Sequence, residues 1–392
     1  MDTLHTVAEA DALMRQSLHP LAPISLPLEK SIGSTLVTAI KADRPLPPYS
    51  RSMMDGIAFR STGFSGGETL NIAGLHAAGN PPPCSLPDGH AWEIMTGAVV
   101  PDDCDTIVPY EELRWDKGEA KRVHLPASFE SGRFIHRAGS DSPSGDTLVK
   151  AGTIINAPEI AIAASVGLIE LQVTRKPRIG LLTTGDEAVA PGTSPESWQI
   201  RRSNGPTLAA SLAANGLHIA FHQHAPDDEI ELGRLLDLAL GSVDLLIISG
   251  GISKGKKDFI RPLLEARIGA PAFHGVKQRP GKPLAFWPGP PAVFALPGNP
   301  VSVLTTYARY VRPAISLLSG TAIVNPRRFA PQGMTPLPEF SYLMPIAQSE
   351  NLALPPSNSG NFASITGATG ILEIPPASDF TAEMPLHYYP FT

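Results

Sequence analysis

The segment VDLLIISGGISKGKKD, residues 243–258, decides the fold class of this chain. It starts with a continuous aliphatic run, typical of a strand buried on both faces, and continues into a glycine-rich turn. The segments before it alternate in a similar way: RIGLLTTGDE (178–187) and LHIAFHQHA (217–225) predict strands, and NGPTLAASLAANG (204–216) predicts a helix. This alternation indicates a parallel sheet covered by helices, a doubly wound α/β domain.

The rest of the chain extends this domain and surrounds it with others. PLAFW (283–287) and AVFALPGNP (292–300) predict two more strands, and VSVLTTYARYVRPAISLLSG (301–320) predicts a long closing helix. Short strand-like segments separated by glycine and proline elsewhere indicate β domains. We therefore expect a multidomain α/β plus β protein with four parts: an N-terminal helical and extended domain (1–50 and 140–175), an inserted β domain (51–139), the α/β domain (176–320) and a small C-terminal β barrel-like domain (321–392).

Composition excludes several classes of protein. The 392 residues are 42% hydrophobic and 17% charged, which is typical of a globular chain with more than one core. A formal charge of -6 argues against a nucleic-acid-binding protein. No apolar stretch reaches the roughly 20 residues of a membrane span, and the polar start MDTLHTVAEADALMRQ is unlike a secretory signal. We expect a cytoplasmic protein with a small-molecule substrate.

The loop SGGISKGKKD (249–258) fits three kinds of chemistry. It is a near match to a phosphate-binding P-loop, but Lys257 stands where the magnesium-binding hydroxyl is needed. It also contains the G-x-S-x-G pattern of a hydrolase, with Ser253 as nucleophile and only Asp379 and His387 available as distant partners. The third interpretation is an anion-binding loop that ends in the metal-binding carboxylate of Asp258. A zinc site is a weak alternative, because the HQH segment lies on a predicted strand.

Three loops follow predicted strands of the α/β domain: TTGDE (183–187), SGGISKGKKD (249–258) and LPGNPVS (296–302). Ligands of open α/β sheets bind beyond the carboxyl ends of the strands, so these loops should meet at one site. Glu187 and Asp258 supply oxygen ligands suited to Mg²⁺ held together with a substrate phosphate. RPGKP (279–283) adds cations that clamp anionic oxygens. These residues suggest metal-assisted phosphoryl or nucleotidyl chemistry.

The chain resembles the MoeA family, the molybdopterin molybdenumtransferases, which are related to the E domain of gephyrin. The resemblance covers residues 7–320 and continues more weakly to the end. It rests on an ordered set of motifs: SMMDGIAF (52–59), MTGAVVPDDCDTIVPYEE (95–112), IHRAGSDSPSGDTLVKAGT (135–153), LLTTGDE (181–187), SGGISKGKKDF (249–259), RPGKPLAF (279–286) and LPGNPVS (296–302).

The resemblance implies an enzyme of molybdenum cofactor biosynthesis. Its substrates would be adenylylated molybdopterin and molybdate, and its reaction a Mg²⁺-dependent insertion of molybdenum with release of AMP. It also implies an elongated homodimer whose site lies between subunits. Molybdopterin adenylyltransferase and recipient molybdoenzymes would be its protein partners, and neither nucleic acid nor membrane would be bound. The rival hypothesis is a non-catalytic molybdopterin-binding or scaffold paralogue.

The family's functional positions carry over onto named residues of this chain. The resemblance implies catalytic roles for Asp55, Asp141, Glu187 and Asp258, with Glu187 and Asp258 also binding the metal. The resemblance also implies functional roles for Thr96, Asp227, Arg279, Lys282, Pro297 and Pro300, which we expect to bind substrate. We further expect Ser249, Gly250 and Gly251 to supply an anion cradle, and we include Ser253 among the substrate-binding candidates. The chain departs from the family pattern at RRSN (201–204), where Arg202 replaces an acid. We include Arg202 among the candidate substrate contacts.

Overall fold

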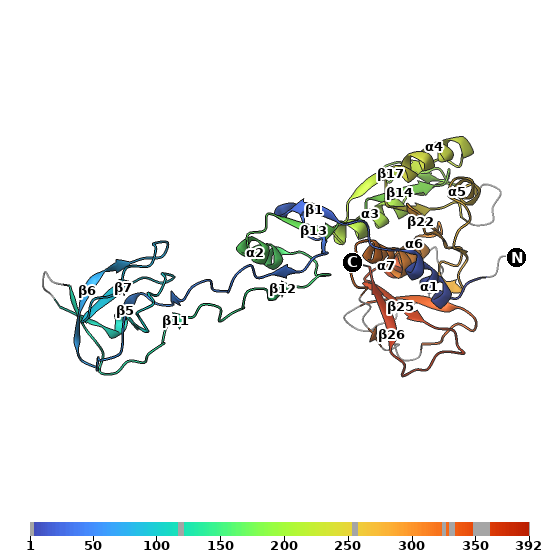
Figure 1. Cartoon of the computed structure of the whole chain (residues 1–392). Coiled ribbons are helices and arrows are strands. Elements are labelled where there is room, and N and C mark those ends of the chain that lie inside the picture. Colours follow the sequence, from blue (N-terminus) through green and yellow to red (C-terminus); the bar gives the residue numbers. More distant parts are fainter. Residues whose placement is uncertain are drawn as a thin grey trace. The chain divides into compact units, whose positions relative to one another are not determined.

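The structure is a computed structural model that describes residues 4–116, 121–252, 258–323, 327–328, 334–347 and 361–391 (Figure 1). It divides into two compact units. The larger unit contains residues 1–38, 151–157 and 170–392, and the smaller unit contains residues 39–150 and 158–169. Each unit has its own hydrophobic core. The fold is mixed α/β plus β, as the sequence predicts.

A six-stranded sheet forms the centre of the larger unit, with the strand order β17, β14, β18, β22, β21, β19. The first four strands are parallel: β17 (Ile219–Ala225), β14 (Ile179–Thr184), β18 (Leu245–Ser249) and β22 (Ala292–Leu296). Strand β18 alternates between two cores, because Leu245 and Ile247 belong to one and Leu246 and Ile248 to the other. This burial on both faces explains its unbroken apolar sequence.

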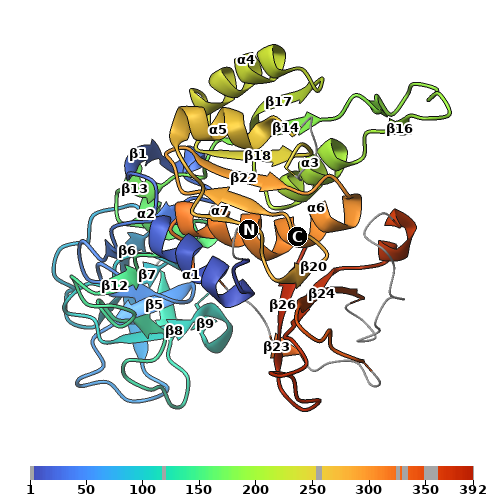
Figure 2. The same ribbon diagram turned by 90° about the vertical axis from the view of Figure 1, so that its right-hand side faces the viewer.

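Helices cover both faces of this sheet (Figure 2). On one face the core contains residues of α1 (Val7–Ser17), α3 (Asn204–Ala214), α6 (Pro300–Thr306) and α7 (Arg312–Leu318). On the other face it contains residues of α4 (Glu229–Leu240) and α5 (Ile260–Ile268). Helix α4 begins at a side-chain cap, because the Asp228 side chain accepts a hydrogen bond from the Glu231 amide. The doubly wound arrangement is therefore present.

Two strands at the end of the sheet are antiparallel to their neighbours, whereas the sequence predicts a wholly parallel sheet. β21 (Ala285–Trp287) is antiparallel to β22, and β19 (Phe273–His274) is antiparallel to β21. Only residues 288–291 connect β21 to β22. A parallel neighbour needs a crossover of a dozen residues or so, and a link this short can only form a hairpin.

The predicted closing helix is interrupted. Between α6 and α7 lies a π-helical segment, Tyr307–Val311, so residues 300–318 form one helical rod with a local change of winding. Pro313 lies two residues after the segment and has no backbone N–H to donate to the carbonyl four residues earlier. The altered hydrogen-bonding pattern before Pro313 is consistent with this missing donor.

Two smaller sheets complete the larger unit. Near the N-terminus, β1 (Ile24–Pro27), β13 (Glu170–Thr174) and β2 (Thr35–Leu36) form a three-stranded sheet. The C-terminal sheet has the order β20 (Gln278–Arg279), β24 (Ser341–Ile346), β25 (Gly370–Ile374), β26 (Leu386–Pro390), β23 (Arg327–Arg328). Its first strand, β20, comes from the segment between β19 and β21, so the RPGKP motif begins within the C-terminal sheet.

The smaller unit is built mainly from β-strands. Its six-stranded sheet has the order β8 (Thr106–Pro109), β5 (Gly56–Phe59), β7 (His90–Ile94), β6 (Thr69–His76), β10 (Arg122–His124), β9 (Arg114–Trp115). Two short strand pairs accompany it: β4 (Arg51–Ser52) with β11 (Ile135–His136), and β3 (Ile40–Lys41) with β12 (Thr147–Val149). Helix α2 (Ala157–Ser165) lies almost entirely in the second segment of this unit. Of the helices formed by described residues in either unit, none is long and apolar enough to cross a membrane.

Candidate functional site

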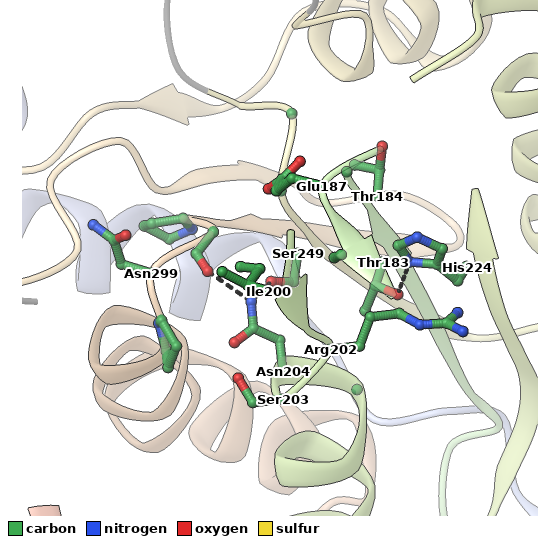
Figure 3. Close-up of a pocket in the computed structure, with 18 of the residues that line it drawn as sticks. Thr183, Thr184, Glu187, Ile200, Arg202, Ser203, Asn204, His224, Ser249 and Asn299 are labelled. Atoms are coloured by element: carbon green, nitrogen blue, oxygen red, sulfur yellow. Dashed lines mark hydrogen bonds between the residues drawn. The ribbon is translucent and has the colours of Figure 1, made fainter. Parts of the chain in front are cut away.

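A pocket of about 470 Å³ opens at the carboxyl ends of β14, β18 and β22 (Figure 3). Its lining comes from the loops that follow these strands, from the start of α3 and from a two-stranded sheet of β15 (Ala188–Val189) and β16 (Ile200–Arg201). Parallel strands of an open sheet present their carboxyl ends on one side, where loops and helix starts leave a crevice. The pocket lies where the strand pattern predicts a ligand site.

A tight glycine turn forms the floor of the pocket. Gly250 and Gly251 have φ angles of +103° and +62°, which favour glycine. A Cβ atom on Gly250 would lie 2.7 Å from the carbonyl oxygen of Thr184, the last residue of the neighbouring strand. The backbone therefore passes too close to β14 for any side chain at this position. Ser249, just before the turn, is buried.

Asn204 joins two of the strand-end loops. Its Nδ2 donates to Ser249 Oγ at 2.9 Å and to the Gly298 carbonyl at 2.7 Å. Asn204 is also the first residue of α3, an eleven-residue helix that begins at the pocket. The positive end of the helix dipole adds to the anion-binding character of this wall. Asn204 Oδ1 is buried and has no hydrogen-bond partner among the described residues.

Carboxylates line another part of the pocket. The side chains of Glu187, Asp227 and Asp258 are all among its lining residues. Asp227 is held in place: its Oδ1 accepts from Thr184 Oγ1 at 2.5 Å, and its amide donates to Asp186 Oδ1 at 3.0 Å. Within the ranges that the structure describes, no group of three or more His, Cys, Asp or Glu side chains is arranged to hold a metal ion. Mg²⁺ is commonly bound through only one or two protein carboxylates, because it keeps water ligands and also binds substrate phosphate.

A basic corner faces these groups. Arg202, just before α3, lines the pocket together with His224 at the end of β17 and Thr183 of β14. Figure 3 shows the Arg202 side chain beside His224, whose Nδ1 lies 2.8 Å from Thr183 Oγ1. Burial lowers the pKa of His224, and the positive charge of Arg202 lowers it further.

The pocket brings together many of the residues that the sequence singled out, and leaves others elsewhere. Those that line it are Glu187, Arg202, Asp227, Ser249, Gly250, Gly251, Asp258, Pro297 and Pro300. Arg279 and Lys282 are exposed and are not among the described lining residues; the RPGKP motif contributes only Pro283. The Arg279 guanidinium lies 5.1 Å from the centre of the Phe340 ring. Ser253 lies outside the described residues, and neither Asp379 nor His387 lines the described part of the pocket.

Asp55, Thr96 and Asp141 belong to the smaller unit. Asp55 Oδ1 accepts hydrogen bonds from the Thr96 amide at 2.6 Å and from Thr96 Oγ1 at 2.8 Å, and these bonds lower the pKa of Asp55. Asp141 Oδ1 lies 2.7 Å from His136 Nε2, and this hydrogen bond lowers the pKa of Asp141. Both exposed carboxylates are therefore fixed in their charged form.

Sequence reasoning missed three of the residues that shape the pocket: Asn204, His224 and Thr183. Asn204 carries a signal, because an amide side chain at the start of a helix that follows a strand-end loop is placed to bridge loops. His224 carries a weaker one, since it lies near the carboxyl end of a predicted strand. The sequence suggests His224 only as a weak candidate zinc ligand. Thr183 lies in the TTGDE loop that the sequence singles out, but nothing in that pattern distinguishes it as a pocket residue.

Comparison with known proteins agrees with this geometry. Residues 5–167 match the MoeA N-terminal region (domain I and II), and residues 180–316 match a probable molybdopterin binding domain. A molybdopterin molybdenumtransferase from Synechocystis sp. is 33% identical over 383 residues, which cover 94% of this chain and 95% of that protein. Its namesake from Haemophilus influenzae is 32% identical over 318 residues, covering 80% of this chain and 78% of that protein.

Solved structures extend the agreement to the whole fold. The crystal structure of the molybdopterin biosynthesis MoeA protein from Pyrococcus horikoshii has a TM-score of 0.82 and 26% sequence identity, and the match covers 100% of both chains. Two family regions therefore cover most of the sequence, and a relative 33% identical aligns over 95% of its own length. The chain belongs to the MoeA family of molybdopterin molybdenumtransferases, the transferases of molybdenum cofactor biosynthesis.

Proposed function

We propose that this protein binds adenylylated molybdopterin in the pocket at the ends of β14, β18 and β22. It cleaves the adenylate in a Mg²⁺-dependent reaction, releases AMP and inserts molybdenum from molybdate into the dithiolene of the pterin. The observation that carries the proposal is the composition of one pocket. Glu187 and Asp258 share it with the Gly250–Gly251 turn and the start of α3. Carboxylates beside an anion-binding surface are what metal-assisted phosphoanhydride cleavage requires.

Glu187 and Asp258 would hold Mg²⁺ together with substrate phosphate and water. When bound, the ion polarises the phosphoryl oxygens and offsets the charge that develops on them. Asn204 keeps the loop after β18 close to the loop after β22, through its bonds to Ser249 and to the Gly298 carbonyl. Pro297 and Pro300 shape the wall of the pocket, and Asp227 borders it in a fixed orientation. These residues bind and orient the substrate.

Other parts of the proposal rest on family resemblance. Arg279 and Lys282 would neutralise pterin phosphate or molybdate, and Ser249 with Ser253 and the glycine turn would cradle an anion. Asp55, Thr96 and Asp141 would complete the site of the other subunit in a homodimer. The four-domain division and a cytoplasmic location, with molybdopterin adenylyltransferase and recipient molybdoenzymes as partners, belong to the same proposal. Light scattering on the purified protein tests the dimer.

The direct test is AMP release from adenylylated molybdopterin by the purified full chain, with Mg²⁺ and with or without molybdate. We expect molybdate-dependent release, quantified by chromatography of the nucleotide. Asp258→Ala should slow it on the order of 100-fold or more, because metal-ion stabilisation of charge contributes several kcal/mol. Binding of the pterin nucleotide should be largely preserved in this variant.

A matched control is Asp379→Ala, which removes an exposed carboxylate that does not line the described pocket. It should release AMP at the normal rate, whereas a hydrolase that depended on Asp379 would be inactivated. Unchanged turnover in Asp258→Ala would overturn the metal assignment. Tight binding of the pterin nucleotide by the unaltered protein without AMP release would replace the enzyme by a carrier or scaffold.

A further inference from the structure

Arg202 occupies an unusual position in the pocket. It follows β16 directly, and its amide donates to the Val189 carbonyl at 2.9 Å, so its backbone is anchored to β15. From there its side chain extends along the pocket toward the ends of β14 and β17 (Figure 3). The backbone of Arg202 is therefore held between the β15–β16 strand pair and the start of α3.

One hydrogen-bond donor of the Arg202 side chain, the Nε–H group, is buried without a partner among the described residues. Leaving a buried donor of a charged group unpaired is costly, and native proteins rarely tolerate it without a reason. An incoming ligand that accepts a hydrogen bond would remove this cost.

His224 lies beside Arg202 and is a second group that can contact an anion. His224 is half-buried, with Nδ1 hydrogen-bonded to Thr183 Oγ1 at 2.8 Å. The pKa of His224 is lowered by burial and by Arg202, against the opposing effects of the Gly185 carbonyl, Asp227 and Glu187. Near neutral pH His224 is therefore largely uncharged beside the permanently charged Arg202. A bound anion at this corner would pair with Arg202 and would favour protonation of His224.

We propose that Arg202 and His224 form a subsite for a tetrahedral oxyanion. Arg202 makes the direct contact, because a planar guanidinium matches the oxygens of such a group with two parallel N–H bonds. His224 adds a second positive charge at the same place when it is protonated. The oxyanion is either a phosphoryl group of the nucleotide or a free oxyanion such as molybdate. The subsite rests on the proposed function only in assuming that an anionic substrate enters this pocket.

The test is calorimetric titration of the purified full chain with AMP and, separately, with sodium molybdate. Arg202→Gln should weaken binding of at least one probe by about 10- to 100-fold, which corresponds to losing a hydrogen bond to a charged group. His224→Gln should weaken the same probe by a smaller factor. The matched control is Arg234→Gln, which removes an exposed arginine of α4 that does not line the pocket. It should leave both affinities unchanged.

The probe that responds identifies the source of the oxyanion. Weakened AMP binding assigns the subsite to the nucleotide, and weakened molybdate binding assigns it to the free oxyanion. Equal affinities of Arg202→Gln and the unaltered protein for both probes would overturn the subsite. If Arg202→Gln does not fold, Arg202→Lys keeps the charge but loses the two-pronged geometry, and the same comparison applies. AMP release measured in parallel distinguishes a failure of the subsite from a failure of the proposed function. If anion binding depends on Arg202 but the unaltered protein releases no AMP, the proposed function is refuted and the subsite is retained.

Discussion

Gly250 illustrates how a single residue determines the shape of the site. It sits immediately after β18, at a φ of +103°, with the Thr184 carbonyl where a side chain would begin. The close approach of two backbones at the strand ends leaves the space above them open for a ligand. This residue type was predictable from the glycine-rich loop. The reason for it, contact with the neighbouring strand, was not, because Thr184 is far away in the sequence.

Gly250→Ala is therefore expected to destabilise the larger unit by about 1–3 kcal/mol, from an unfavourable φ and the clash with Thr184. Urea unfolding followed by tryptophan fluorescence measures the change. Gly192→Ala is a suitable control, because a Cβ atom there meets nothing within 4 Å. If both variants unfold at the same urea concentration, the turn is not under the constraint described.

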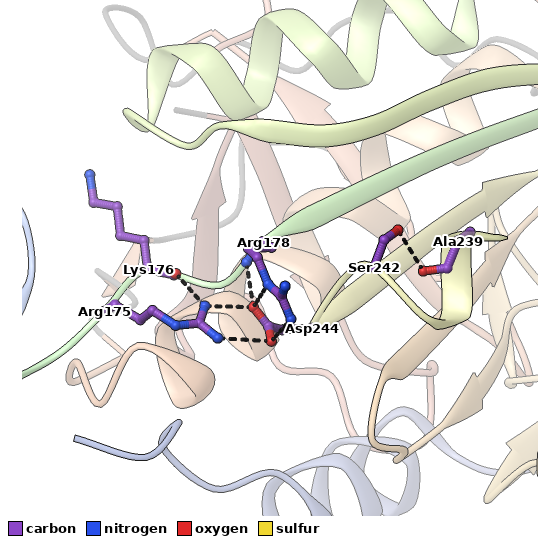
Figure 4. Close-up of polar contacts among 6 residues, drawn as sticks. All are labelled: Arg175, Lys176, Arg178, Ala239, Ser242 and Asp244. Carbon is purple, nitrogen blue, oxygen red and sulfur yellow. Dashed lines mark hydrogen bonds and ion pairs between the residues drawn. The ribbon is translucent and has the colours of Figure 1, made fainter. Parts of the chain in front are cut away.

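At the scale of secondary-structure elements, an ion cluster fixes the amino-terminal ends of two strands (Figure 4). Asp244, just before β18, accepts two hydrogen bonds from the Arg175 guanidinium, at 2.6 and 3.0 Å. It also accepts one from the Arg178 amide at 2.7 Å, just before β14. The Asp244 backbone contacts both neighbours, since its N–H donates to the Arg178 carbonyl and its C=O accepts from the Ala292 amide. The cluster therefore sets the alignment of β14, β18 and β22.

The pKa of Asp244 predicts how stability changes in acid. Burial would raise it, but the hydrogen bonds from Arg175 and Arg178 outweigh burial and hold it well below its usual range. Because the folded-state pKa is depressed, the stabilisation is complete above the unfolded-state pKa of about 4 and is lost as the pH falls below it. Asp244→Asn should cost about 2 kcal/mol near neutral pH and flatten the loss of stability below pH ~4.

Urea midpoints measured from pH 7 to pH 3 test this expectation. Asp237→Asn serves as the control, because Asp237 pairs with Arg267 on the exposed surface of α4, where an ion pair contributes little. A pH profile of Asp244→Asn that runs parallel to that of the unaltered protein would argue against the cluster as the source of acid sensitivity.

At the scale of the whole molecule, Arg309 connects three regions of the larger unit. It lies in the π-helical segment and is 3% exposed. Its Nη1 pairs with Asp11 of α1 at 2.7 Å, and its Nε pairs with Glu373 of β25. Its guanidinium also lies over the rings of Tyr310 and Tyr389. The N-terminal helix, the α/β core and the C-terminal sheet thus share one buried cation.

Arg309→Met should destabilise the larger unit by about 3–5 kcal/mol, because Glu373 would keep a half-buried charge without Arg309 and Asp11 would keep only its ion pair with Arg15. Replacing all three, as Arg309→Met with Asp11→Leu and Glu373→Leu, should recover much of this loss, since no unpaired charge remains. Equilibrium unfolding of both variants provides the measurement. If the triple variant is less stable than Arg309→Met, this expectation is wrong, and the charged side chains stabilise the folded state by more than neutralising one another.

Elements whose signals are local can be predicted from the sequence. The apolar run of β18 and the glycine turn behind it depend on residues a few positions apart, and the sequence predicts both. The position of the pocket followed too, because parallel strands end on one side.

Contacts between residues far apart in the sequence are visible only in the folded chain. The antiparallel β21, the bridge from Asn204 to Ser249 and the corner of Arg202 with His224 all depend on strand order and side-chain direction. These are set by packing across the whole sheet, which no short stretch of sequence contains.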